Sequence, residues 1–541
     1  MHTPTACEGE KPASHWSRAV SVARKVWLGL VVIILSWNPN AGLHADEITL
    51  DVIAKKAEER ARKPFHSPRA DLPEVLRQDK LDYDKYREIR FRRQKALWND
   101  KEVLFRVEFF HPGYLYQEPV HVHEFTASYS QPVRFVQDFF DYGKLPIANQ
   151  IPTSTGYAGF RLLFPLNNPD NMDELGAFLG ASYFRLLGKG QRYGASARGL
   201  ALDSGESDRP EEFPLFTDWW LGKPGKGERT VRLFAILDSV SCTGAYEFLI
   251  RPGETTSVEV QAVIFLRAAD KVRAANPKAN PLKTIGLAPL TSMFRFGKNS
   301  EHKMDDYRPE VHDSDGLLVR LDNGESLWRP LNPTSVLRHQ TFPANNIRGF
   351  GLLQRDRRFE SYEDLFNLYQ LVPSLWVEPR GNWGEGELHL VELPAHYEGF
   401  DNIVAFWDPK VKPQPLQPFH FAYALLWTRE TDVKLSENTV ASTRVGAVPG
   451  NPRQRQFAID FSGPKLAGLS KAQPPQVAAS CGGNAIIVES LVFPNSYNNS
   501  WRIMLKMEPK TDNKEPVDIR CSLKQAEEVL TETWVYRWSP P

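Results

Sequence analysis

The strongest constraint on the fold of this 541-residue chain is the alternation of apolar and polar residues in many short runs. In the run 256–266, Val258 and Val260 would lie on one face and Glu259 on the other, which is the pattern of a half-buried β-strand. Similar runs, separated by Gly and Pro turns, recur from about Val103 onward. This organisation favours β-sandwiches over a sheet of alternating strands and helices. We therefore expect an all-β fold.

Three stretches depart from the alternating pattern. Apolar residues at helical spacing predict helices at Ile48–Arg62 and Leu76–Arg93. The run Ala268–Lys283 is rich in Ala, Lys, Asn and Pro and predicts a surface loop.

Residues 1–45 have the pattern of an export signal. Basic residues precede the apolar run Val26–Trp37, which is too short for an ordinary membrane-spanning helix. Leu43-His-Ala45 is a plausible cleavage site just before Asp46. We expect a cleaved signal and an exported protein, with an uncleaved N-terminal anchor as the alternative.

A proline-rich segment predicts the domain boundary. Four prolines lie within Asp408–Pro418, and such a stretch is stiff, extended and poor in backbone donors. We therefore expect a large domain over 46–407, a linker over 408–418 and a second domain over 419–541. About six or seven strands in the last segment fit a small immunoglobulin-like sandwich. A Cys481–Cys521 disulfide within it is conceivable, although a sequence does not show proximity.

The composition narrows the classes of ligand. Lys+Arg and Asp+Glu both number 66, so the formal net charge is zero and nothing suggests a partner nucleic acid. No cluster of Cys and His has the spacing of a zinc site, and we expect no metal. The chain has 14 Trp, 17 Tyr and 31 Phe. Such aromatics either stack on sugar rings or fill β-sheet cores.

Two acidic clusters are candidates for chemistry. His312, Asp313 and Asp315 lie together just before Gly316. Acids beside a histidine can act as a base or hold a metal ion; the alternative is a turn in which the Asp side chains bond to their own backbone. Glu398 and Asp401 lie just before an apolar strand, in a loop that would present them outward for chemistry. The alternative is that they are solvated loop residues without a functional role. Between the two clusters, aromatic and charged residues alternate in a manner that suits carbohydrate binding: Tyr369, Trp376, Glu378, Arg380 and Trp383. We expect the substrate to be bound by Tyr369, Trp376, Arg380, Trp383, His312 and Glu398.

The chain resembles the periplasmic glucan biosynthesis protein G/D family of Gram-negative bacteria. The similarity runs from about Asp51 to the C-terminus and is clearest before Trp407. The matching words are Phe178–Arg185, Ser196–Asp203, Ile285–Phe294, Val311–Gly316, Gly349–Asp356, Ser374–Pro379 and Asp401–Trp407.

The resemblance implies a large β-sandwich with a carbohydrate cleft, followed by a smaller immunoglobulin-like sandwich. It implies a periplasmic role in making osmoregulated glucans with a β-1,2-linked glucose backbone. Members of the D type resemble inverting β-1,2-glucan hydrolases, and related members rearrange the chain. Three functions remain open: a hydrolase or transglycosylase, a non-catalytic glucan-binding protein, and an assembly protein that docks a membrane glucan synthase. A homodimer is a further open alternative, and the words do not separate the G and D types.

The resemblance also implies residue roles. The general acid of the family corresponds to Asp401, the base to Asp313, and a site-associated Glu to Glu398. An acid role requires that Asp401 stay protonated near neutral pH, which burial in an apolar cleft would supply. Asp313 would remain ionised, helped by Arg308 or His312, and would act through a chain of waters. No metal or organic cofactor is implied. One departure is Val372, where the family commonly has an Arg.

Overall fold

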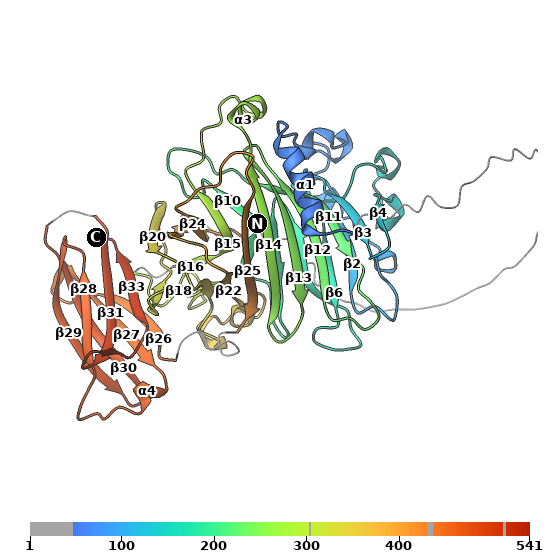
Figure 1. Cartoon of the computed structure of the whole chain (residues 1–541). Helices are drawn as coiled ribbons and strands as arrows, with labels where there is room; N and C mark the ends of the chain where they lie inside the picture. Colours follow the sequence, from blue (N-terminus) through green and yellow to red (C-terminus); the bar gives the residue numbers. More distant parts are fainter. Residues whose placement is uncertain (1–46, 302–303, 396, 430–436, 512–514, 541) are drawn as a thin grey trace, which may run out of the picture.

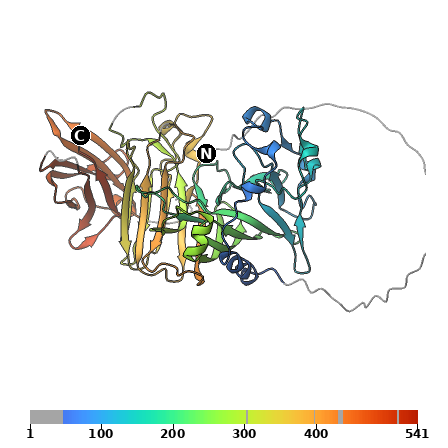
Figure 2. The same cartoon turned by 90° about the horizontal axis from the view of Figure 1, so that it is seen from above.

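The computed structural model describes residues 47–301, 304–395, 397–429, 437–511 and 515–540. Strands dominate the described chain and form a large and a small sandwich that lie side by side (Figures 1 and 2). This confirms the predicted all-β class. The predicted signal, residues 1–45, lies outside the described residues. No helix in the described ranges combines the length and the apolar character of a membrane span.

One layer of the large sandwich is a ten-stranded sheet within the described residues. Its strands pair in the order β2-β6-β7-β8-β9-β15-β24-β23-β20, and β10 also pairs with β15. Their bounds are β2 (Arg106–Phe110), β6 (Gly159–Phe164), β7 (Asp173–Leu179), β8 (Tyr183–Leu186), β9 (Ser196–Arg198), β10 (Leu200–Leu202), β15 (Ile285–Ser292), β20 (Arg338–Ala344), β23 (Gly386–Glu392) and β24 (Ile403–Pro409).

The facing layer is a longer sheet that continues into the small sandwich. Its described strands pair in the order β28-β31-β33-β19-β18-β21-β22-β25-β14-β13-β12-β11-β3-β4, with β32 beside β31. Their bounds are β3 (His121–Phe125), β4 (Ser130–Val133), β11 (Leu215–Gly222), β12 (Val231–Asp238), β13 (Cys242–Arg251), β14 (Thr256–Leu266), β18 (Gly316–Arg320), β19 (Ser326–Pro330), β21 (Gly349–Leu353), β22 (Ser374–Arg380), β25 (Phe419–Thr428), β28 (Gln476–Cys481), β31 (Val517–Gln525), β32 (Glu528–Val529) and β33 (Thr533–Trp538).

The small sandwich packs a four-stranded sheet against β28, β31 and β33. The sheet has the order β26-β27-β30-β29, with bounds β26 (Thr439–Val448), β27 (Asn451–Ser462), β29 (Ala485–Asn495) and β30 (Ser500–Pro509). Its core includes Phe457, Ile503 and Trp534. Shorter elements are β1 (Arg90–Phe91), β5 (Phe140–Asp141), β16 (Phe294–Phe296), β17 (Val311–His312), α1 (Leu50–Ala61), α2 (Tyr83–Tyr86), α3 (Ala269–Ala275), α4 (Pro464–Ala467), η1 (Pro68–Asp71), η2 (Glu74–Leu76), η3 (Arg93–Lys95), η4 (Gln137–Phe139), η5 (Ala148–Gln150), η6 (Phe359–Ser361) and η7 (Tyr369–Leu371).

Strand β14 shows how the alternation becomes a buried layer. Val258 and Val260 face the core between the two sheets. On the other face, Val263 and Phe265 pack beneath α1. Thr49 is the N-cap of this helix, because its side chain accepts a hydrogen bond from the Val52 N–H. The predicted helix at Ile48–Arg62 is therefore confirmed.

The predicted domain boundary is wrong. The proline-rich segment Asp408–Pro418 connects β24 of one sheet to β25 of the other, so it crosses over within the large sandwich. Strand β25 pairs with β14 and β22, and the chain leaves the large sandwich only after Thr428. Asp408 and Pro409 still pair with β23, and Pro415 forms an isolated bridge with Leu266, so the expectation of a stretch free of sheet pairing is met only in part. Proline-rich composition is common to crossovers and linkers and does not distinguish them.

Three smaller predictions also need correction. The stretch Leu76–Arg93 holds only α2 and short 3-10 turns, because Leu76 and Leu81 are five residues apart and would not share one helix face. The predicted loop Ala268–Lys283 contains α3 in its Ala-rich first half. Cys481 and Cys521 are free cysteines, since β28 and β31 pair out of register for a bridge between them.

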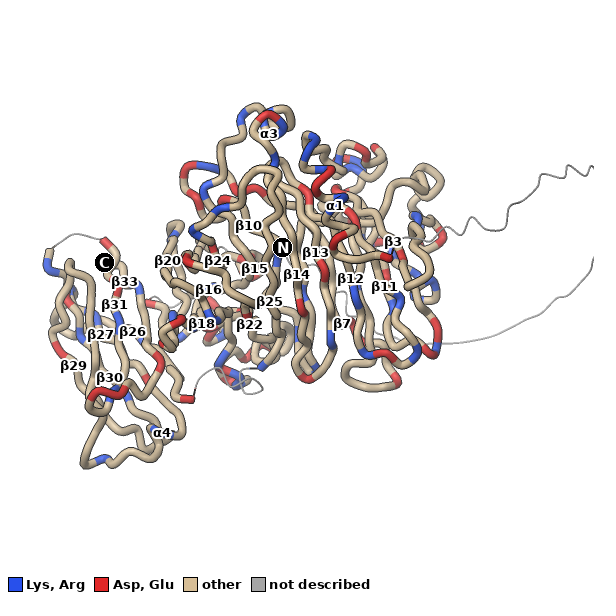
Figure 3. The backbone as a smooth tube through the Cα atoms, viewed as in Figure 1, with Lys and Arg blue, Asp and Glu red and all other residues tan. Residues whose placement is uncertain are grey.

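Charge is spread over both sandwiches. Figure 3 shows Lys and Arg interspersed with Asp and Glu along the visible strands and loops, without a block of one sign. This distribution agrees with the formal net charge of zero. The predicted carbohydrate cleft stays a prediction.

Candidate functional site

The two candidate catalytic acids are carried by loops that attach to the same short stretch of backbone. The Asp313 N–H donates to the Met293 carbonyl over 2.8 Å, where β17 pairs with β16. The buried Asn402 side chain accepts from the Phe294 N–H over 2.8 Å and donates to the Phe294 carbonyl over 3.0 Å. Consecutive residues of one segment therefore fix the positions of Asp313 and Asp401.

Asp313 is a buried carboxyl with an unusual proton affinity. It is 2% exposed, and Oδ2 has no hydrogen-bond partner within the described part of the chain. Burial, followed by the nearby Asp401 charge, raises the pKa of Asp313 to about 8. The guanidinium of Arg185 partly opposes this shift. The sequence-based expectation that Asp313 is ionised is therefore not met in the free protein at neutral pH.

Asp401 is half-buried at the start of the segment that leads into β24. The Thr291 hydroxyl on β15 donates to Asp401 Oδ2 over 3.5 Å. The Asp401 charge also acts on Asp313 and on the Tyr183 hydroxyl, so the three side chains form one electrostatic neighbourhood. Two carboxyls in different environments, one half-buried and one buried, therefore lie within electrostatic range of each other.

Glu398 is held by an arginine and a tyrosine. Arg308 Nη1 lies 2.6 Å from Glu398 Oε2, and the Tyr369 hydroxyl donates to the same oxygen over 3.3 Å. Burial, together with the charges of Asp313 and Glu398, raises the pKa of Tyr369. Arg308 also pairs with Asp306 and Asp364, and these hydrogen bonds raise the pKa of its guanidinium. The structure thus brings Tyr369 and Glu398 near Asp313, and their role in substrate binding stays a prediction.

The residues of β8 that point away from the core are polar, and they interact electrostatically with the two acids. Arg185 and Tyr183 alternate with core residues along β8, and Tyr183 pairs across the sheet with Arg198. The Arg198 guanidinium lies 5.2 Å from the Tyr183 ring centroid. These residues fall in the matched words Phe178–Arg185 and Ser196–Asp203, but no role was predicted for them.

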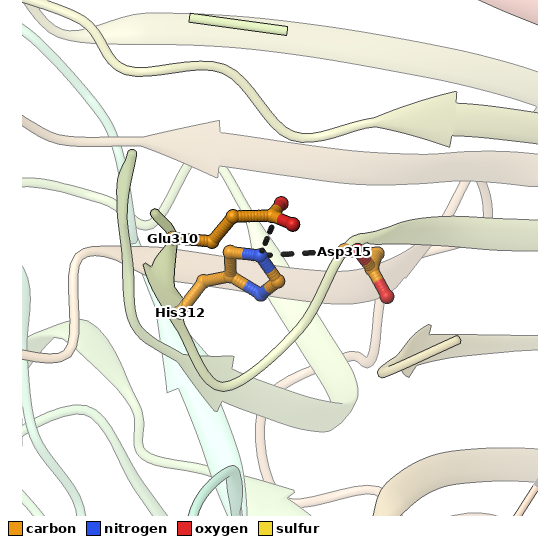
Figure 4. Close-up of side chains that lie close together, drawn as sticks. All are labelled: Glu310, His312 and Asp315. Atoms are coloured by element: carbon orange, nitrogen blue, oxygen red, sulfur yellow. Dashed lines mark hydrogen bonds and ion pairs between the residues drawn. The ribbon is translucent and has the colours of Figure 1, made fainter. Parts of the chain in front are cut away.

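His312 belongs to a buried ion-paired network. Its Nε2 lies 3.3 Å from Glu310 Oε2 and 3.8 Å from Asp315 Oδ1 (Figure 4). Burial lowers the pKa of His312, but the hydrogen bond to Glu310 and the two carboxylates raise it overall. His312 is 0% exposed, so it supports the Asp313 loop from behind and does not offer a surface to a sugar.

Glu310, His312 and Asp315 could each offer one ligand atom to a metal ion. Each already has another function in the structure. Lys298 Nζ lies 2.8 Å from Glu310 Oε1, and Asp315 Oδ2 accepts the Asp356 N–H over 2.9 Å. His312 Nδ1 bonds to the Gln354 side chain over 2.9 Å. The arrangement is explained by protein groups alone, and the residues fit a salt-bridged turn.

Three predicted substrate-binding residues lie away from the acids. Trp376 is 0% exposed in the core that joins the two sandwiches. Trp383 packs on the large core and donates from Nε1 to the Ala422 carbonyl over 3.1 Å. Arg380 pairs with Glu259 over 2.9 Å at the exposed end of β22. These are corrections. Trp376, Glu378 and Arg380 share one face of β22, and the buried start of that face packs against the small sandwich while its exposed end carries ion pairs. Trp383 lies beyond the end of the strand.

Val372 occupies the position where the family commonly has an arginine. It is 1% exposed and belongs to an apolar cluster with Met293, Val311 and Tyr369. Gly194 packs directly against it, since a Cβ on that glycine would lie 2.0 Å from a Val372 methyl group. In this chain the position therefore contributes packing beneath Tyr369.

Sequence reasoning missed Asn402 and Gln354 as supports of the site. The Gln354 amide donates to the His312 and Tyr369 carbonyls over 2.9 and 3.3 Å, and so joins the loop that carries Asp313 to Tyr369. The available signal was that a polar residue, Gln354, directly follows the apolar run Gly349–Leu353. A buried polar side chain usually has specific partners.

Comparison with known proteins gives a consistent result. The family described as "Periplasmic glucan biosynthesis protein, MdoG" matches residues 48–538. "Glucans biosynthesis protein G" of Serratia proteamaculans (strain 568) is 39% identical over 531 residues, covering 96% of this chain and 97% of the relative. The protein of the same name from Pseudomonas aeruginosa (strain LESB58) is 41% identical, covering 90% and 92%. That from Ralstonia nicotianae is 40% identical, covering 91% and 96%.

Proposed function

Because the chain belongs to the periplasmic glucan biosynthesis protein family, we propose that it acts on the β-1,2-linked backbone of osmoregulated periplasmic glucans. The proposed activity is that of an inverting glycoside hydrolase or transglycosylase. One observation carries the chemical part: a buried carboxyl, Asp313, has a pKa of about 8 beside the second carboxyl of Asp401. A pair of neighbouring carboxyls is the set of groups that inverting glycosidic cleavage needs.

The proposed roles are those that the family resemblance implies; the raised pKa of Asp313 taken alone would favour the reverse assignment. Asp401 protonates the leaving glycosidic oxygen, and Asp313 takes a proton from the attacking water through intervening waters. Glu398 and the Tyr369 hydroxyl, which share a hydrogen bond, bind the sugar beside the acid. His312 positions the base loop from behind. No organic cofactor is proposed for these steps.

The pH dependence tests which carboxyl is the base. If Asp313 is the base, it must lose its proton before turnover, so kcat/KM should rise as pH increases through about 8, the pKa of Asp313. If Asp313 is the acid, kcat/KM should fall over the same range. A profile that falls through this range would reverse the two assignments.

The decisive experiment incubates the mature protein with linear β-1,2-glucan and follows the products by mass spectrometry. Asp313→Asn and Asp401→Asn should each lower turnover about 10²–10⁴-fold, because an amide cannot exchange the proton. Affinity measured by calorimetry should change far less. Asp315→Asn is the matched control, because Asp315 accepts backbone N–H groups in the turn and should mainly affect stability.

Two outcomes would contradict the proposal. If Asp315→Asn abolished turnover and Asp313→Asn did not, the base would be misassigned. If the wild-type protein bound the glucan without cleaving or rearranging it, the alternative would hold. The protein would then be a glucan-binding or assembly protein that works with a membrane glucan synthase.

A further inference from the structure

Two adjacent apolar side chains stand in solvent near the proposed site. Leu365 is 82% exposed and Phe366 is 87% exposed. Both belong to the segment that connects η6 with η7, immediately before Tyr369. Scattered exposed leucines need no explanation, but an adjacent aromatic and aliphatic pair beside a polar site is a candidate binding surface.

The turn that presents this pair is built by a buried carboxylate. Asp364 is 2% exposed, and its Oδ1 accepts the N–H groups of Phe366 and Asn367, each over 2.8 Å. Glu363 and Leu368 bracket the turn with φ angles of 51° and 54°. Such left-handed backbone costs about 1–3 kcal/mol per non-glycine residue, so the surrounding contacts hold this turn in place.

The same turn is tied to the candidate acids. Arg308 Nη1 contacts Asp364 Oδ2 over 2.8 Å and Glu398 Oε2 over 2.6 Å. Glu398 lies three residues before Asp401. On the other side, Tyr369 follows Phe366 by three residues and bonds to Glu398. The exposed pair therefore has a fixed position relative to the acid segment.

A second exposed ring lies against the same arginine. Tyr307 is 76% exposed, and the Arg308 guanidinium lies 5.7 Å from its ring centroid. Tyr307 and Phe366 are thus exposed aromatic residues on two loops joined by Arg308. Ring faces of this kind accept the C–H groups of a sugar without any charge being desolvated.

We propose that Phe366 and Tyr307, which lie on two loops joined by Arg308, form an outer glucan-binding subsite that holds a glucose unit remote from the bond that reacts. The identity of this ligand rests on the proposed function. The glucan reaches this subsite because its neighbouring glucose units occupy the region of Glu398 and Asp401. Arg308 ties both loops to that region. Long glucans should use the subsite, whereas short oligosaccharides should fill only the region of the acids.

The test compares Phe366→Ala and Tyr307→Ala with Tyr497→Ala. Tyr497 is 100% exposed on the small sandwich and is the matched control. Calorimetry would measure the Kd of a linear β-1,2-glucan of about 20 units and of a trisaccharide, in an Asp401→Asn background that prevents cleavage. Losing one aromatic contact should raise the Kd of the long glucan about 3–10-fold, and leave that of the trisaccharide unchanged. Tyr497→Ala should change neither.

Each outcome separates this inference from the proposed function. An unchanged long-glucan Kd in Phe366→Ala overturns the subsite, even if the wild-type protein cleaves glucan. Equal losses for both ligands also overturn it, because they would indicate a general disturbance of the site. A selective loss supports the subsite even if the wild-type protein proves not to be an enzyme. If Phe366→Ala converted a wild-type dimer to a monomer in sedimentation, the surface would bind a second copy of the chain and the proposal would be wrong.

Discussion

At the scale of single residues, the site depends on where one proton resides. Asp313 has a pKa of about 8 because burial disfavours its charge and the Asp401 charge repels it. Arg185 and His312 reduce this effect without cancelling it. A buried carboxyl with a raised pKa stabilises the fold while it is protonated, and this stabilisation is lost where the pH forces it to ionise.

This predicts a pH-dependent stability difference for Asp313→Asn. The folded-state pKa of about 8 exceeds the ordinary value of 3.8, so the stabilisation from a protonated Asp313 is complete below about pH 4 and is lost as pH rises through 8. The asparagine variant cannot ionise. Its free energy of unfolding in urea, relative to wild type, should rise by on the order of a few kcal/mol between pH 4 and pH 9.

A pH-independent difference between the two proteins would contradict this account. Asp401→Asn provides a companion measurement. It removes the larger of the two carboxylate charges that raise the pKa of Asp313, so this pKa should fall toward its ordinary value in a carboxyl carbon NMR titration. An Asp313 pKa that did not move would mean that the Asp401 charge does not contribute to it.

At the scale of elements, the segment from β15 to β16 positions the chemistry. Thr291, Met293 and Phe294 contact Asp401, Asp313 and Asn402 in turn. The Asn402 side-chain amide makes the hydrogen bonds that a neighbouring strand would make, because it satisfies both the N–H and the carbonyl of Phe294. It also donates to the Leu393 carbonyl over 2.9 Å.

Asn402→Ala should therefore lower both stability and turnover. Each buried backbone group left without a partner costs about 1–3 kcal/mol, and Asp401 would lose its fixed position. Asn299→Ala is the matched control, since Asn299 is also buried and bonds to Leu331 and Asn332 through its amide. Urea unfolding should report a loss in both variants, whereas kcat on β-1,2-glucan should fall only in Asn402→Ala. An unimpaired kcat in Asn402→Ala would show that Asp401 does not depend on this clamp.

At the scale of the whole molecule, the two sandwiches share one core and one sheet. Strands β19 and β33 pair in parallel, with Trp328 opposite Trp534. Arg355 of the large sandwich reaches Glu532 through two hydrogen bonds of 2.8 and 2.9 Å. The Arg355 N–H also donates to Asp315, two residues from Asp313. The candidate site is therefore connected to the interface between the sandwiches.

Arg355→Ala should weaken that interface strongly. The Glu532 side chain is 0% exposed and would keep its charge without a partner arginine, which typically costs about 3–5 kcal/mol. Arg358→Ala, three residues along, is the control, because its ion pair with Asp356 uses a guanidinium side chain that is 66% exposed. That pair is worth at most about 1 kcal/mol. Calorimetric melting should show a separate early transition for the small sandwich only in Arg355→Ala. Equal melting of the two variants would mean that the shared sheet alone holds the sandwiches together.

The sequence by itself determined the class of fold and the identity of the main acidic groups. Alternation along strands such as β14 depends only on neighbouring residues, because one face of a strand meets a core and the other meets solvent or a helix. The words around Asp313 and Asp401 likewise showed in the sequence which family the chain resembles.

Only the tertiary structure decided the rest, because it depends on contacts between distant residues. The proline-rich segment could equally have been a linker or a crossover until β25 paired with β14 and β22. Trp376 could equally have met a sugar or a core until the second sandwich packed against it. The proton on Asp313 depends on burial and on a carboxylate 88 positions away in the chain, and no local pattern encodes either quantity.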